Sequence, residues 1–440
     1  MNIKKIIILL LLIISTIANA QKKVLWLNGI LGDQNPGMWN LYNNNLTPTN
    51  GETITYTSMF NSIKSIANSY PNQQINPTNK DLILVGYSLG GLVGRTMQLN
   101  NSYVKGIISA GCPNQGSALI ANTISGNVFN VIDVGISKSN TAINNSSVAT
   151  VFCAPPVSIL SAPIVLGIEA FKTAALVGLG VVKEALGAAI DIYSTRTPCT
   201  QDLVPGSPYI VESQNKYISV PYINIYGAED YWQVLRLAGS CANLVQMQDP
   251  ANLDVSYDEI YFPTMYSALS TINTIQTIHD DVYQALVYPA IFMPWIWATR
   301  ELVLSARHDW DGVYRYLETD MHNNYAGIVG ANAYELRSYC VQEWFFDDPY
   351  MQIQGMNKIV APDQGVGHWE TVCYTKNVPI TLEHDGVVTS KAVIVPGTKG
   401  VKILNMRLAG TNHLEMGNKL EMRELLKEIF SGATYGQDFQ

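Results

Sequence analysis

The sequence predicts an α/β fold in which a mostly parallel central sheet is flanked by helices and interrupted by large helical insertions. The first observation behind this prediction is that short apolar runs of strand length alternate with helical patterns, an order typical of parallel sheets. The second is a strand-like run that passes through a glycine-flanked serine directly into a helix-like run. The strand candidates are the runs 24–27, 82–85, 106–109, 222–226, 392–395 and 401–404.

The most informative stretch joins the strand candidate 82–85 to a helix-like run at 92–99 through Gly86, Ser88 and Gly90. The two glycines stand two positions before and after the serine, where side chains would collide in a very tight turn. Strand, G-x-S-x-G and helix together are the sequence form of a nucleophile elbow, which holds a serine in a strained conformation with its hydroxyl exposed. A glycine-rich turn without chemistry is the alternative, but the flanking strand and helix favour Ser88 as a nucleophile.

A serine nucleophile needs a general base, and the base needs an orienting carboxylate. In folds with such an elbow these residues follow in the order serine, Asp or Glu, and histidine. His413 is the one histidine after the last strand candidate, so it is the expected base. Asp385 stands on a polar turn ahead of apolar residues and is the favoured acid, while Glu229 and Asp230, which follow the run 222–226, remain alternatives.

Acyl transfer through a tetrahedral intermediate also needs N–H donors for the oxyanion. The backbone N–H of Leu89, next to the nucleophile, is the first expected donor. The second is expected from the loop after the first strand candidate, where Gly29 lets the backbone approach the substrate. Ile30 is the favoured residue in that loop, and Leu31 is the alternate.

The predicted chemistry needs no cofactor, and the sequence indicates no metal site. The metalloprotease pattern H-E-x-x-H and cysteines paired as C-x-x-C are both absent. The remaining histidines are weaker candidates for catalysis; they are His279, His308, His322, His368 and His384.

The first 20 residues have the pattern of a cleavable signal peptide, with two lysines, an apolar run from 6 to 14 and a small-residue cleavage site. The mature chain is therefore expected to begin at about Gln21 and to be secreted or periplasmic. Loss of Lys4 and Lys5 changes the net charge from −8 to −10, which argues against a nucleic-acid partner. Only 14% of residues are charged, against about 25% in an average protein, and such a surface suits contact with lipid.

Six cysteines follow the expected cleavage site, and an exported chain can oxidise them to disulfides. Spacing does not define the connectivity, but the pairs Cys153–Cys199 and Cys340–Cys373 would each staple one inserted segment. Cys112 follows an apolar strand candidate and could equally be a buried free thiol. The sequence gives no prediction of oligomeric state.

Together these residues resemble the α/β-hydrolase superfamily, and more narrowly the secreted triacylglycerol lipases and the related lipase-like esterases that include inositol deacylases. The matching stretches are residues 28–32, 86–91, 111–117, 202–207, 385–388 and 412–415. The resemblance implies an α/β-hydrolase fold for the sheet-forming half of the mature chain and a triad of Ser88, Asp385 and His413. Two residues depart from the family pattern, since Asn28 stands where His is usual and Cys112 replaces a common Thr. Some lipases of this kind bind a structural calcium ion, but the sequence shows no ligand set for one.

Two inserted segments separate the sheet-forming stretches. The expected organisation is a signal peptide at 1–20, a hydrolase core at 21–116, 215–230 and 378–440, a lid insertion at 117–214 and a helical cap insertion at 231–377. Within the lid, apolar residues recur every three or four positions between 164 and 192, which predicts an apolar helical face. That helix is either buried in the core or part of a mobile lid that makes transient contact with a lipid interface.

The expected activity is hydrolysis of carboxylic esters through an acyl-enzyme, with lipids carrying medium or long acyl chains as the favoured substrates. An acyltransferase would use the same triad but pass the acyl group to another acceptor. A lipid-binding or surface-binding protein without activity is the alternative from a different class. The two insertions are expected to determine which ester is accepted.

Overall fold

The computed structural model describes residues 23–30, 50–54, 56–58, 60–69, 81–100, 102–125, 128–152, 158–194, 196–229, 232–247, 249, 252, 255–257, 259–346, 367–395, 401–432 and 437–439. The chain divides into two compact units. The first is formed by Met1–Gly330 together with Glu383–Gln440, and the second by Ala331–Leu382.

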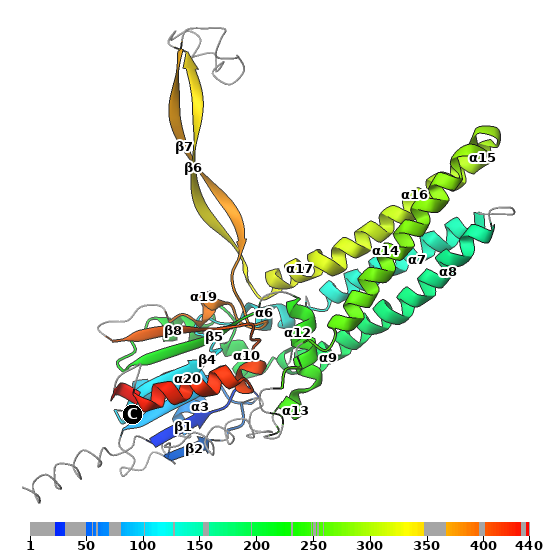
Figure 1. Ribbon diagram of the computed structural model, residues 1–440. Coiled ribbons are helices and arrows are strands. Elements are labelled where there is room, and N and C mark those ends of the chain that lie inside the picture. Colours follow the sequence, from blue (N-terminus) through cyan, green and yellow to red (C-terminus); the bar gives the residue numbers. More distant parts are fainter. Residues whose placement is uncertain are drawn as a thin grey trace, which may run out of the picture. The chain divides into compact units, whose positions relative to one another are not determined.

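The described strands of the first unit form a parallel sheet with the order β2-β1-β3-β4-β5-β8 (Figure 1). They are β1 (Lys23–Leu27), β2 (Asn50–Ile54), β3 (Leu82–Tyr87), β4 (Val104–Ala110), β5 (Tyr222–Ala228) and β8 (Ile403–Ala409). The strands β1 and β3 are buried along nearly their whole length, as parallel strands covered on both faces are. The α/β fold with a parallel central sheet is therefore confirmed.

One of the strand candidates does not join this sheet. Residues 392–395 were expected to form a strand, and that prediction is wrong, because the chain there forms the short helix α19 (Ser390–Val393). The hydroxyl of Thr389 caps this helix by accepting a hydrogen bond from the N–H of Ala392 at 3.2 Å. Val393 and Val395 are buried, so the apolar run anchors the segment in the core without pairing in the sheet.

Helices cover both faces of the sheet. Those close to it in the first unit are α3 (Ile63–Ser69), α5 (Leu89–Asn100), α6 (Ala118–Ile124), α10 (Pro198–Asp202), α11 (Pro208–Gln214), η6 (Glu415–Gly417), α20 (Leu420–Ser431) and η7 (Gln437–Phe439). Because side chains alternate along a strand, Leu25 and Leu84 enter a core shared with α3, α5 and α11. Trp26 and Ile83, one position away, enter the opposite core, which they share with α20.

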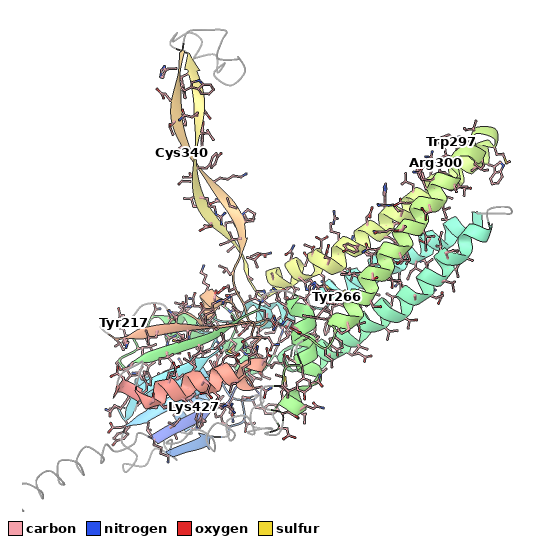
Figure 2. The ribbon with its side chains drawn as sticks, in the orientation of Figure 1. Tyr217, Tyr266, Trp297, Arg300, Cys340 and Lys427 are labelled. Carbon is pink, nitrogen blue, oxygen red and sulfur yellow. A yellow bond between two sulfur atoms is a disulfide. The ribbon has the colours of Figure 1, made fainter. Side chains whose placement is uncertain are left out.

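The inserted segments of the first unit contain long helices that pack against one another (Figure 1). Their elements are α7 (Asn130–Phe152), α8 (Ser158–Phe171), the π-helical turn η1 (Lys172–Leu176), α9 (Val177–Ser194), α12 (Gln233–Ala242), α13 (Leu244–Met247), α14 (Phe262–Ala285), α15 (Val287–Phe292), α16 (Pro294–Arg315), the π-helical turn η3 (Tyr316–Asp320) and α17 (Met321–Ile328). We call α7, α8, α14, α15 and α16 the helical arm; Trp297 and Arg300 lie at its α15 end (Figure 2). Within the described residues, no helix combines the length and the apolar character that crossing a bilayer requires.

The apolar face predicted between residues 164 and 192 lies on α8 and α9 and is buried. Its buried side chains are Ile164, Ile168, Phe171, Leu179, Val182 and Leu186. Gly167 faces Ile275 of α14 so closely that a Cβ would stand 2.8 Å from the Ile275 side chain. The face is therefore a packing surface, which favours the buried-helix interpretation. Other apolar residues of these two helices are exposed, namely Val165, Leu166, Val177 and Val181.

The second unit is a long antiparallel hairpin formed by β6 (Asn332–Phe346) and β7 (Gly367–Thr381). The segment 231–377 was expected to be a helical cap; its helices end with α17 at Ile328, and the strands of the hairpin follow. The hairpin leaves large apolar side chains such as Tyr334 and Leu336 exposed, so no buried face gave its sequence a clear period. Its strands are held together by the backbone ladder and by a disulfide.

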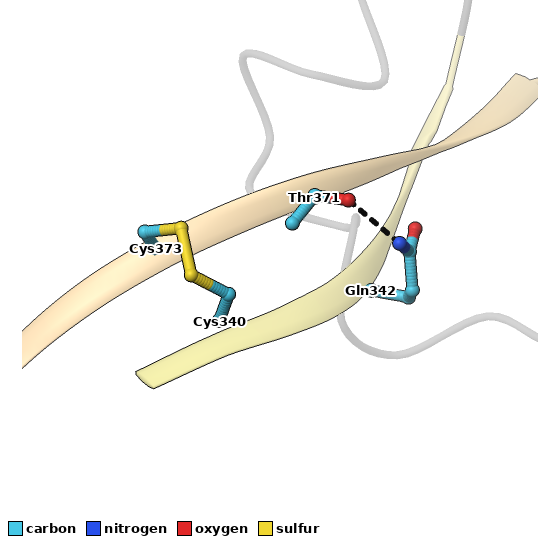
Figure 3. Close-up of a disulfide and its surroundings, with 4 residues drawn as sticks. All are labelled: Cys340, Gln342, Thr371 and Cys373. Carbon is cyan, nitrogen blue, oxygen red and sulfur yellow. Dashed lines mark hydrogen bonds between the residues drawn. A yellow bond between two sulfur atoms is a disulfide. The ribbon is translucent and has the colours of Figure 1, made fainter. Parts of the chain in front are cut away.

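Only one of the two expected disulfides forms. Cys340 and Cys373 are directly opposed in the hairpin and are bonded, close to a hydrogen bond of 2.6 Å between Gln342 and Thr371 (Figure 3). Cys199 is a buried free thiol, so the expected pair Cys153–Cys199 is wrong; Cys153 itself lies outside the described residues. Cys112 is also a buried free thiol.

Candidate active site

Ser88 lies in a strained turn between β3 and α5. Its φ of 51° falls in the left-handed region, which is costly for a residue with a side chain. A Cβ on Gly86 would collide with the backbone of Gly90, and a Cβ on Gly90 would collide with the carbonyl oxygen of Leu27. The N–H of Ser88 donates to the carbonyl oxygen of Ala110 at 2.7 Å and ties the turn to β4. The local geometry is that of a nucleophile elbow.

The loop after β1 passes directly beside the elbow. A Cβ built on Gly29 would stand 3.2 Å from Cβ of Ser88 and 3.0 Å from the ring of Tyr87. This close approach brings the neighbouring residue Ile30, which is partly buried, alongside the turn. Leu89 begins α5, and the N–H groups of a first helical turn have no partner within the helix. The alternate oxyanion residue Leu31 lies outside the described residues.

Asp385 and His413 come together although 28 residues separate them. Nδ1 of His413 lies 2.7 Å from Oδ2 of Asp385, and both side chains are almost completely buried. The other carboxylate oxygen of Asp385 accepts hydrogen bonds from the N–H groups of Val387 at 3.0 Å and Val388 at 2.7 Å. The N–H of His413 donates to the carbonyl oxygen of Asp385 at 2.7 Å. The carboxylate is thus fixed on both sides and can hold the imidazole in one orientation.

His413 also contacts the elbow and the end of β4. The hydroxyl of Tyr87 donates to the carbonyl oxygen of His413 at 2.8 Å, and the two rings lie 5.2 Å apart. Gly111, at a φ of 59°, lies so close that a Cβ would stand 2.9 Å from the imidazole. Among the described residues, the buried Nε2 of His413 has no hydrogen-bond partner. The ring nitrogen opposite Asp385 is therefore available for a proton transfer.

Of the two alternative acids, Glu229 lies in the described part of the chain and faces a cation. Glu229 follows β5 and faces Arg236, whose Nε lies 3.8 Å from a carboxylate oxygen of Glu229. Asp230 lies outside the described residues. His384, beside the acid, is buried, and its Nδ1 accepts a hydrogen bond from the N–H of Gly386 at 3.1 Å. Burial lowers the pKa of His384, which keeps it neutral next to the Asp385 carboxylate.

Several residues that support this site carry no signal in the sequence. Arg236 of α12 and Lys419 both donate to the carbonyl oxygen of Gly410, at 2.9 and 2.8 Å. This carbonyl lies at the start of the loop that carries His413. The hydroxyl of Tyr325 in α17 donates to the carbonyl oxygen of Gly386 at 2.7 Å and fixes the turn after Asp385. These partners lie up to 174 residues apart in the sequence, so no local pattern could pair them.

Within the stretch 111–117, Asn114 has a structural role. Its side-chain N–H groups donate to the carbonyl oxygen of Val393 at 2.6 Å and to Oδ1 of Asn224 at 3.2 Å. The side chain is completely buried, so these bonds connect the end of β4 to β5 and α19. The signal in the sequence that could have identified Asn114 was the family resemblance of the stretch 111–117.

No group of His, Cys, Asp and Glu side chains in the described part of the chain is arranged to hold a metal ion. The Asp385–His413 pair lies beside the elbow that carries Ser88, since Tyr87 of the elbow contacts His413.

Part of the chain matches a known protein family. A family model described as "PGAP1-like alpha/beta domain" matches residues 40–160, a segment that contains Ser88 but ends well before Asp385 and His413. Among solved structures, the chain is similar to the lipase BlEst2 of Bacillus licheniformis in its mature form, with 9% identity, a TM-score of 0.37 and coverage of 94% of this chain and 92% of that one. It is also similar to juvenile hormone epoxide hydrolase from the silkworm Bombyx mori, with 12% identity, a TM-score of 0.23 and coverage of 59% and 71%. No curated protein sequence matches the chain.

The PGAP1-like segment carries the sheet strand β3, the elbow and the helix α5. The parallel sheet, with helices on both faces and helical insertions between its strands, completes the architecture. The chain therefore has an α/β fold with a parallel central sheet, and its residues 40–160 are similar to a PGAP1-like alpha/beta domain.

Proposed function

We propose that this protein is a serine hydrolase that cleaves carboxylic esters through an acyl-enzyme. The observation that carries the proposal is the buried hydrogen bond of 2.7 Å between Asp385 and His413, next to the strained elbow that holds Ser88. A buried carboxylate that fixes an imidazole beside a serine elbow is the arrangement of a Ser-His-Asp triad.

In the proposed mechanism, Oγ of Ser88 attacks the ester carbonyl while Nε2 of His413 takes the serine proton. Asp385 stabilises the imidazolium that forms, and the N–H groups of Leu89 and Ile30 bind the oxyanion. His413 then protonates the leaving alcohol, which departs and leaves an acyl-serine. A water molecule, deprotonated by His413, attacks the acyl-serine. The bond between the acyl group and Oγ breaks, His413 returns the proton to Ser88, and the acid is released.

The favoured substrates are lipids with medium or long acyl chains, and the expected setting is outside the cytoplasm. The low charged fraction of 14% and the exposed apolar residues on α8 and α9 support a lipid substrate. The Cys340–Cys373 disulfide is consistent with an oxidising compartment, in line with the signal-peptide pattern at 1–20. The insertions at 117–214 and 231–377 are proposed to select the ester.

The proposal is tested with the variant Ser88→Ala, which removes the nucleophilic hydroxyl and keeps the Cβ atom. We expect hydrolysis of p-nitrophenyl esters to fall by at least 1,000-fold, to the residual rate of an oxyanion site without a nucleophile. Asp385→Asn should lower kcat strongly, whereas Glu229→Gln should leave the chemical step far less affected. Full activity in Ser88→Ala would disprove the mechanism, and a greater loss in Glu229→Gln would reverse the choice of acid.

A series of esters from short chains to emulsified triglyceride defines the substrate. We expect kcat/KM to rise with acyl-chain length. An acyl product found on an added alcohol or amine, in place of free acid, would indicate an acyltransferase that uses the same triad. Binding of lipid vesicles without hydrolysis of any ester would indicate a lipid-binding protein.

A further inference from the structure

The end of the helical arm is free of charge over a long stretch of sequence. Between Asp281 of α14 and Arg300 of α16 the chain has no Asp, Glu, Lys or Arg. This stretch includes the end of α14, the whole of α15 and the first turns of α16. We call residues 282–299 the arm tip. Charged residues return at once on either side of it.

A second charge-free stretch belongs to the neighbouring pair of helices. No Asp, Glu, Lys or Arg lies between Lys138 of α7 and Glu169 of α8. α7 packs against α16, and α8 packs against α14, so the two stretches belong to one bundle. Side chains confirm the register, because Ser146 of α7 bonds His279 of α14 and Trp310 of α16. From Ser146 of α7 to Ile168 of α8 the sequence contains no Asp, Glu, Lys or Arg.

Large apolar side chains of the arm tip are exposed. The exposed fractions are 63% for Ile291, 44% for Met293, 53% for Trp295 and 46% for Trp297. Exposed tryptophan is costly in water, since its indole is mostly apolar. Trp297 lies roughly 20 Å along the helix from the buried Trp310, because each residue adds about 1.5 Å. The tip thus presents both kinds of side chain, since Leu286, Ala290 and Ile296 are buried and the four residues above are exposed.

Arg300 marks the boundary of the tip. Its guanidinium stacks over the ring of Tyr283 at 3.9 Å and lies 5.1 Å from the ring of Trp297. The first cation on α16 is thus fixed next to an exposed tryptophan. Tryptophan and arginine side by side are typical of residues that lie at the level of lipid headgroups, with apolar residues beyond them.

We propose that the arm tip, residues 282–299, docks on a phospholipid bilayer and inserts its apolar side chains below the headgroups. Ile291 and Met293 enter the acyl region, the two exposed tryptophans lie at the interface, and Arg300 contacts lipid phosphate. The insertion is shallow, because none of the described helices is suited to crossing a bilayer. The proposal does not depend on the activity of Ser88, and it assigns lipid contact to the end of the helical arm.

A bilayer fits this surface better than a protein partner does. A protein interface of ordinary composition places polar and charged groups around an apolar centre and pairs them with the partner. Here the two stretches that form the end of the bundle contain no charge for a partner to pair with. Hydrocarbon excludes charge strongly, so it accounts for both stretches at once.

Vesicle flotation tests the proposal with the full chain carrying Ser88→Ala, so that no lipid can be hydrolysed. The probes are vesicles of phosphatidylcholine alone and vesicles that also contain phosphatidylglycerol. We expect the protein to float with both. The double variant Trp295→Asp/Trp297→Asp should lower the partition coefficient at least tenfold. The matched control Val245→Asp, at an exposed apolar residue of α13 outside the arm, should leave it within twofold.

The depth of insertion is measured by the quenching of tryptophan fluorescence with brominated lipids. This quenching should be lost in Trp295→Phe/Trp297→Phe. Hydrolysis of a short, water-soluble p-nitrophenyl ester by the wild-type chain should be unchanged by the Asp substitutions, so the two proposals fail separately. Equal flotation of the double variant and its parent would overturn the inference, as would no flotation of the parent. A parent that does not float but forms dimers, which the double variant abolishes, would assign the tip to a second copy instead.

Discussion

Replacement of Gly111 by alanine tests whether His413 is the general base. Gly111 lies at the end of β4 with a φ of 59°, and a Cβ there would stand 2.9 Å from both Cε1 and Nδ1 of His413. Nδ1 is the atom that bonds Asp385, so the new methyl group presses on the side of the ring that the acid holds. Gly206 is a matched control, because it also has a positive φ, of 77°, and a Cβ added there would have no atom within 4 Å.

The two variants separate backbone strain from displacement of the imidazole. Positive φ costs a residue with a side chain about 1–2 kcal/mol, so both variants should lose about that much free energy of unfolding. Carbon atoms pack best at about 3.5–4.0 Å, so in Gly111→Ala the ring must move by roughly 0.5–1 Å. A misplacement of about 1 Å in a catalytic group can cost about 100-fold in rate. Gly206→Ala should keep its kcat.

The assay combines urea unfolding with hydrolysis of a short p-nitrophenyl ester. We expect similar losses of stability in the two variants and a loss of roughly 100-fold in kcat for Gly111→Ala alone. If both variants hydrolyse the ester at the wild-type rate, the imidazole of His413 is not in the chemistry, and the proposed triad fails. If Gly206→Ala loses as much kcat as Gly111→Ala, strain and not displacement explains the effect.

Three further predictions concern groups outside the triad. Burial lowers the pKa of His322 to about 4 from 6.5, so between these pH values the unfolded chain binds a proton that the folded chain does not. The free energy of unfolding should fall by about 2–3 kcal/mol between pH 7.5 and pH 4.5, and His322→Phe should remove that part of the slope in urea titrations. Replacing Cys340 and Cys373 by serine should cost the hairpin about 3–4 kcal/mol, seen as faster hydrogen exchange in β6 and β7 with the sheet unchanged. Burial raises the pKa of Cys112 to about 12, so iodoacetamide at pH 8 should modify it only after unfolding; rapid labelling in the native state would contradict its burial.

The sequence predicted best what short windows of the chain determine. The runs at 24–27, 82–85 and 222–226 lie in β1, β3 and β5 because strands buried on both faces must be apolar throughout. The elbow was visible because steric exclusion acts over two residues on either side of Ser88. The α/β architecture follows from the alternation of such windows.

The parts that depend on distant partners could not be predicted in the same way. The run 392–395 has the composition of a strand, but Asn114, 279 residues away in the sequence, holds the carbonyl oxygen of Val393. The hairpin of β6 and β7 buries few side chains, and its disulfide joins residues 33 positions apart. No local pattern marked its strands, so the segment was expected to belong to the helical cap. In each case tertiary contacts overrode a weak local preference.

The choice between the two acids shows how distant contacts assign roles to similar residues. Glu229 and Asp385 are both buried carboxylates close to the turn at Gly386. Glu229 faces the buried guanidinium of Arg236, which also donates to the carbonyl oxygen of Gly410. A buried cation without a counter-charge would be strongly destabilising, so Glu229 balances the cation that anchors the histidine loop. Asp385 is held by backbone N–H groups and has one oxygen directed at His413, which leaves it the carboxylate able to stabilise an imidazolium.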